Sequence, residues 1–242
     1  MRLGLLGLLF AGLASAQSGI PSFALNSVGR GVDFQVRINA PVVRDAPFAA
    51  EERSSAAGVT KVYRDGAGRT RLERALTPSL VEIHDPEGGV FVVLDEARRV
   101  AHRVTYTRPP APGPAPLEAL NPLGAVGAFV SAPVVEGPKA EDRTEALGTR
   151  LFEGVEATGQ RDSLTYPANS MGNSEPLVAT QESWYAASIH ATVLAIQRHP
   201  QTGEIRTELV NIKVGEPEGA LFRVPEGYEV VEDQALLFRV TW

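Results

Sequence analysis

Apolar and polar positions alternate in short runs between residues 60 and 106, and turn-forming residues separate the runs. Valine, isoleucine, phenylalanine, threonine and tyrosine dominate these runs, as is typical of strands. Glycine, proline and aspartate fill the breaks, most clearly at Asp65–Gly68 and Asp85–Gly89. The pattern predicts an antiparallel meander with strands at Thr60–Arg64, Arg69–Leu76, Leu80–His84, Val90–Leu94 and Val100–Tyr106.

Two segments precede the meander. Val32–Ala40 alternates strictly between apolar and polar residues, which predicts a half-buried strand that Pro41 stops. Pro47–Ala57 has fair helix propensity but no apolar stripe, so the sequence favours irregular structure or a strand there.

A second β block is expected from residue 144 to residue 242. Gly148 is expected to separate two strands within Glu145–Gly159, and a further strand is expected at Arg161–Tyr166. Ile189–His199 is apolar on both faces, which is typical of a central strand. The remaining strands of this block are expected at Leu177–Tyr185, Glu204–Lys213 and Ala235–Trp242.

Segments with helical periodicity are short, so the chain is expected to be mainly β with little helix. Six prolines within Arg108–Pro122 exclude both a strand ladder and a helix, which indicates an extended connector. The expected organisation is a signal peptide at 1–16, a mobile N-terminus at 17–31, a first β block at 32–106, a proline-rich connector at 107–143 and a second β block at 144–242 in the same sheet.

The first residues predict export. Arg2 supplies a positive charge, Leu3–Leu13 is apolar, and Ala14–Ala16 fits a cleavage site before Gln17. The sequence therefore predicts a periplasmic or extracellular, membrane-proximal protein without a transmembrane helix. The absence of cysteine excludes disulfides and thiol catalysis. A net charge of −6 disfavours nucleic acid as a partner.

Few residues point to catalysis. His84, His102, His190 and His199 are too widely spaced in sequence to form a local metal motif, so no metal site is expected. The sequence contains no nucleophile elbow, phosphate-binding loop or dinucleotide fingerprint, so we expect no cofactor. An enzyme is the least favoured class, although a site assembled across a sheet would leave no local motif. The basic pair Arg69 and Arg71 is interpreted as charged turn and edge residues that discourage strand addition.

Several stretches between Val62 and Val231 carry a resemblance. Val62–Arg71, Ile83–Pro86, Val93–Asp95 and Leu221–Tyr228 resemble an uncharacterised family of exported bacterial proteins with the pattern YRDxxGRTR…IxDPxxGxxYxLD…LFxVPxGY. The layout is more remotely similar to periplasmic lipoprotein-carrier and envelope-sensor domains. That similarity implies a curved antiparallel sheet, either a half-barrel or an open barrel, with an acyl chain or a peptide on its concave side. This chain differs in having no long helix to plug such a half-barrel.

The leading hypothesis is a non-catalytic exported envelope or extracellular β domain that binds an apolar, lipid-like or peptide ligand. Five residues are the candidates for lining the groove: Val100, Val104, Trp184, Tyr185 and Val193. One alternative is a structural or surface-assembly protein that uses its terminal strand and proline-rich segment. Another is an outer-membrane β-barrel, because Leu236, Phe238, Val240 and Trp242 alternate at the C-terminus.

Overall fold

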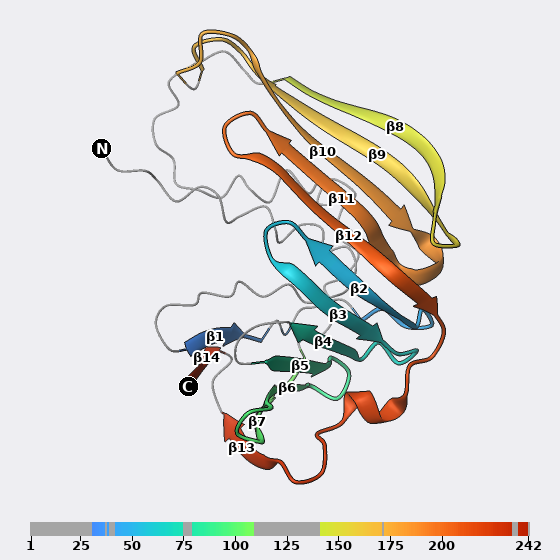
Figure 1. Cartoon of the computed structure of the whole chain (residues 1–242), viewed down its shortest axis with the longest axis vertical. Coiled ribbons are helices and arrows are strands. Elements are labelled where there is room, and N and C mark those ends of the chain that lie inside the picture. The colour runs from blue at the N-terminus through green and yellow to red at the C-terminus, as the bar shows by residue number, and fades with distance from the viewer. Residues whose placement is uncertain are drawn as a thin grey trace.

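The computed structural model describes residues 31–36, 38, 42–74, 79–108, 141–170, 172–233 and 237–241. Within these ranges the chain forms a 12-stranded sheet and a separate two-stranded sheet (Figure 1). The predicted signal peptide and mobile N-terminus, and nearly all of the predicted connector, lie outside the described residues.

The predicted meander is confirmed. It consists of β3 (Gly58–Arg64), β4 (Thr70–Arg74), β5 (Leu80–Asp85), β6 (Val90–Asp95) and β7 (Val100–Thr105), each antiparallel to the next. Residues 48–54, for which the sequence left two structures open, form β2 (Phe48–Ser54). This strand pairs with β3, and its inward residues Phe48 and Ala50 are buried.

The first part of the second block, residues 141–166, contains fewer and longer strands than the sequence indicated. β8 (Glu141–Phe152) runs through Gly148, and β9 (Val155–Tyr166) is continuous across the break predicted near Gly159. The prediction that Gly148 separates two strands is therefore wrong. Gly148 has a φ of +79° at a bulge within the ladder, and the chain reverses at Glu153 and Gly154 instead.

Three further long strands follow in this block: β10 (Leu177–Ala186), β11 (Ala191–His199) and β12 (Gly203–Val214). β11 begins two residues later than predicted, because Ala187–Ile189 forms a short 3₁₀ turn, η3, that closes at the left-handed residue His190. β12 pairs with β2, so strands from both sides of the predicted connector belong to one sheet.

The strand order of the large sheet is β13-β7-β6-β5-β4-β3-β2-β12-β11-β10-β9-β8. It is an open sheet whose edges are β8 and β13 (Glu229–Asp233), and β13 lies parallel to β7. All other neighbouring strands are antiparallel, which confirms the expected fold class of a mainly β chain with an open antiparallel sheet. Among the described residues, helical structure is confined to η3 and to η4 (Gly219–Phe222).

The small sheet joins segments from the two ends of the sequence. β1 (Gly31–Gln35) pairs antiparallel with β14 (Leu237–Thr241). β1 ends earlier than the predicted strand Val32–Ala40. Phe34, Val36 and Val240 of this region form one buried cluster with residues of β5–β7, so the small sheet covers one face of the meander.

The opposite face of the meander is covered by a loop. Val81, Ile83, Val92, Leu94 and Ala101 form a second buried cluster, against which Val224 and Tyr228 pack. Strands β5–β7 are therefore covered on both faces, which explains the unbroken apolar run Val90–Leu94 of β6.

The basic pair of the β3–β4 hairpin has a structural role that the sequence interpretation missed. Arg71 is 8% exposed on an interior strand and donates to the Leu221 carbonyl at 3.0 Å. Arg69 pairs with the buried Asp65 carboxylate at 2.6 Å, and its guanidinium lies over the Phe222 ring. The interpretation of Arg69 and Arg71 as edge-protecting charges is therefore wrong. Both arginines fasten the hairpin to the η4 segment.

Candidate functional site

A cavity of about 350 Å³ lies between the end of the β8–β9 hairpin and strand β12, with residues of β10 and β11 completing its lining. In the strand order, β9, β10 and β11 separate β8 from β12. A hydrogen bond of 2.9 Å from the Ile212 amide to the Glu153 carboxylate nevertheless joins the hairpin turn to β12. The sheet therefore curls at this end, and the cavity lies inside the curl.

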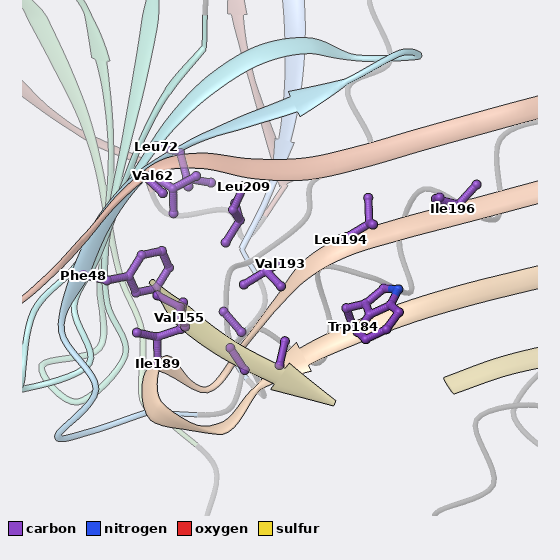
Figure 2. Packing of buried hydrophobic residues seen from close by; sticks show 14 residues of the cluster. Phe48, Val62, Leu72, Val155, Trp184, Ile189, Val193, Leu194, Ile196 and Leu209 are labelled. Atoms are coloured by element: carbon purple, nitrogen blue, oxygen red, sulfur yellow. The ribbon is translucent and has the colours of Figure 1, made fainter. Parts of the chain in front are cut away.

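Apolar side chains from three strands contribute to the cavity wall. Phe152 comes from β8, Leu194 and Ile196 from β11, and Val210 from β12. Leu194 and Ile196 belong to the large buried cluster, and Phe152 packs against it. In Figure 2, Leu194 and Ile196 follow one another along β11. These residues give the cavity a surface that suits the apolar part of a ligand.

Trp184 supports this wall from β10. Its ring centroid lies 5.5 Å from that of Phe152, and the residue is 7% exposed. A Cβ atom at Gly159, on the neighbouring strand β9, would come within 2.8 Å of three Trp184 ring carbons. The indole therefore lies directly on the Gly159 backbone, and only glycine leaves room for it.

The lining also contains five charged residues: Arg150, Glu153, Glu182, Arg206 and Glu208. Glu182 accepts a hydrogen bond from Trp184 Nε1 and another from Arg161, each at 2.8 Å. The Trp184 hydrogen bond is the largest of the effects that hold the pKa of Glu182 below its ordinary value. Arg206 and Glu208 form an ion pair at 2.6 Å. The cavity is therefore amphipathic rather than purely apolar.

A further group of buried polar residues lies outside the cavity lining. Glu82 on β5 is 2% exposed and pairs with Arg74 at 2.8 Å. Burial raises the pKa of both Glu82 and Glu52. The positive charge of Arg74 lowers both pKa values and so offsets part of this rise. These residues come from β2, β4 and β5, whereas the cavity is lined from β8, β10, β11 and β12.

The histidines each have a local partner. His84 is buried, and the Tyr106 hydroxyl lies 2.5 Å from its Nε2 atom. Burial lowers the pKa of His84 to about 4 and raises that of Tyr106 to about 12, so both are neutral at pH 7. His102 contacts Asp233, and His190 contacts Tyr185. In the described part of the chain, no group of three or more His, Cys, Asp or Glu side chains is arranged to hold a metal ion.

The structure separates the five residues that the sequence suggested for a groove. Val193 lines the cavity, and Trp184 packs against Phe152, which is part of the cavity wall. Tyr185 is half-buried and contacts His190 at 3.2 Å. Val100 and Val104 belong to β7 at the other side of the sheet, where Val104 is completely buried beneath β1 and β14.

Sequence reasoning missed the residues of β8 and β12 that define the cavity. Arg150 and Phe152 stand in a strand whose limits were wrongly predicted, so no alternation marked them as inward-facing. Arg206 and Glu208 looked like ordinary surface charges in a hairpin. The usable signal was Gly154, because a glycine followed by the alternating run from Val155 marks a tight turn.

No described helix is long and apolar enough to cross a bilayer. No protein-family model matches the chain, and no curated protein matches it.

Several solved structures align over most of the chain at low identity. An uncharacterized conserved protein from Thermus thermophilus is 11% identical, with 78% of this chain and 91% of that chain covered and a TM-score of 0.41. MucB is 11% identical, with 80% and 62% covered and a TM-score of 0.45. The Mycobacterium tuberculosis lipoprotein LppX is 18% identical, with 71% and 87% covered and a TM-score of 0.26.

Proposed function

We propose that this chain is a non-catalytic binding module of the cell envelope or extracellular space, and that it holds the apolar part of a ligand inside the curled end of its sheet. The observation that carries the proposal is the cavity of about 350 Å³ between the β8–β9 hairpin and β12. Its size falls within the range of about 300–1,000 Å³ that is usual for small-molecule sites. The proposed location rests on the export signal that the sequence predicts.

Binding is favoured over catalysis because the carboxylates of the cavity are engaged. Glu153 accepts the Ile212 amide, Glu208 is paired with Arg206, and Glu182 receives two donors. A general acid or base works best with a pKa near the operating pH, whereas the pKa of Glu182 is lowered. Glu182 is therefore poorly suited to proton transfer, and the contacts of Glu153 and Glu208 support the wall of the cavity.

The alternative of strand exchange through the C-terminal strand has a structural obstacle. β14 is already paired with β1 over five residue pairs, from Gly31 with Thr241 to Gln35 with Leu237. Val240 is 1% exposed within the cluster that covers β5–β7. Exchange would have to break this pairing and open that cluster, so the cavity is the better-supported binding site.

Fluorescence titration with Nile red, a neutral apolar dye, tests the proposal. We expect saturable binding to the native full chain. Val210→Phe adds volume to the cavity wall and should weaken binding by about tenfold, since displacing apolar contact costs roughly 1–2 kcal/mol. Val178→Phe is the matched control, because Val178 is 47% exposed and lies outside the lining.

An absence of saturable binding to the native chain would refute the proposed function. Equal weakening by the Val210 and Val178 substitutions would place the dye elsewhere on the surface. Thermal unfolding of each variant checks that the variant is folded at the temperature of the titration.

A further inference from the structure

The charged groups around the cavity are unequally engaged. Glu153, Glu182 and Glu208 each accept at least one hydrogen bond from a neighbouring group, and Arg206 donates two to Glu208. Arg150 is the exception among the charged groups of the lining. Within the described residues it forms no ion pair or hydrogen bond, and its guanidinium lies 4.9 Å from the centroid of the Phe152 ring.

Stacking on Phe152 leaves the donors of Arg150 available. A guanidinium presents five N–H donors in a planar fork, and stacking on an aromatic face uses none of them. The Phe152 ring in turn contacts Trp184, so the cation is held at the edge of the apolar wall. A ligand that lies along Leu194 and Ile196 therefore has an available cation close to one end.

We propose that the site takes an amphiphile with a single carboxylate end, which Arg150 binds while the hydrocarbon part lies against Phe152, Leu194 and Ile196. This inference rests on the proposed function and adds the chemical class of the ligand. A carboxylate matches the fork of a guanidinium through two parallel hydrogen bonds. Three carboxylates and only two guanidinium groups line the cavity, so a monoanion is favoured over a dianion such as a phosphate monoester.

Isothermal calorimetry with decanoate and decanol on the full chain at neutral pH tests the inference. The native chain should bind decanoate more tightly than decanol. Arg150→Gln should weaken decanoate binding by about three- to tenfold, as expected for a partly exposed ion pair, and should leave decanol binding unchanged. Arg150→Lys keeps the charge and should restore part of the preference. Decanoate binding, but not decanol binding, should also weaken with added salt.

Arg143→Gln is the control, since Arg143 is exposed on the same strand and is not part of the lining. Equal affinity of the native chain for the two ligands would overturn the inference while leaving the proposed function intact. A loss of decanoate binding of the same size in the Arg143 and Arg150 variants would overturn it too. Failure of both ligands to bind would refute the proposed function itself.

Discussion

Replacing Arg64 by methionine tests the idea that one buried cation joins the two halves of the sheet. Arg64 is completely buried on β3. Its Nε and Nη2 atoms donate to the Ala46 carbonyl at 3.0 and 2.9 Å, and Nη2 also donates to the Ile189 carbonyl. Ile189 lies 125 residues further along the chain, in the η3 turn before β11. Methionine retains much of the volume but removes every donor.

The expected loss of unfolding free energy follows from these contacts. Hydrogen bonds to a charged group contribute about 1.5–3 kcal/mol each, and a buried carbonyl left without a donor costs about 1–3 kcal/mol. Removing the buried cation also removes its desolvation cost, which opposes this loss. Burial lowers the pKa of Arg64 to about 10, so the guanidinium is still charged at pH 7, but at a cost in desolvation. We expect a net loss of about 3–5 kcal/mol, since two or three charged hydrogen bonds are lost and two carbonyls lose a donor, while only the desolvation cost of one cation is recovered.

Urea unfolding followed by far-UV circular dichroism measures this loss. An unchanged slope of unfolding free energy against urea concentration would show that unfolding exposes the same amount of surface in both proteins. The control is Arg53→Met on the neighbouring strand β2, whose exposed pair with Glu51 should contribute less than about 1 kcal/mol. A loss below about 1 kcal/mol for Arg64→Met would refute the argument that its carbonyl contacts stabilise the fold.

Two further variants test buried groups. Folding lowers the pKa of His84 from 6.5 to about 4, because the buried imidazole resists protonation. Its contribution to stability is therefore complete above pH 6.5 and is lost as the pH falls from 6.5 to 4. This loss amounts to about 3 kcal/mol of unfolding free energy. The urea midpoint of the native chain should therefore fall more steeply over this pH range than that of His84→Gln. Parallel pH profiles of the two midpoints would contradict this. The raised pKa values of other buried acids act in the opposite direction, but they affect both proteins equally. Gly159→Ala places a methyl group within 2.8 Å of the Trp184 ring, so it should shift tryptophan emission and destabilise the protein by about 1–3 kcal/mol. Gly219→Ala, which meets no atom within 4 Å, should change neither quantity, and equal effects of the two alanines would refute the proposed packing.

Local chemistry determined the parts of the fold that could be predicted. Strands β3 and β5–β7 lie within one or two residues of their predicted limits, because period-two alternation and turn residues act over only a few positions. At Gly148 the local sequence could not decide between a turn and a bulge. A glycine at positive φ serves equally in a turn or in a bulge, and the pairing of β8 with β9 decides which one forms.

The roles of the arginines were decided by tertiary structure. Arg64, Arg69 and Arg71 stand close together in one charged hairpin, where the sequence favours surface positions for Arg69 and Arg71 and indicates no role for Arg64. Arg64 and Arg71 are buried because carbonyl groups more than a hundred residues away accept their hydrogen bonds. A buried guanidinium is stable only where such acceptors exist, and no local pattern reveals them.

The cavity depends even more strongly on long-range structure. Its walls come from residues near 150, 194 and 208, which meet only because five long strands curl until the turn at Glu153 reaches Ile212. The sequence by itself determined that the chain is mainly β and where many of its strands lie. The curl arises from the accumulated twist and bulges of paired strands, and this collective property brings Arg150 to the edge of an apolar wall.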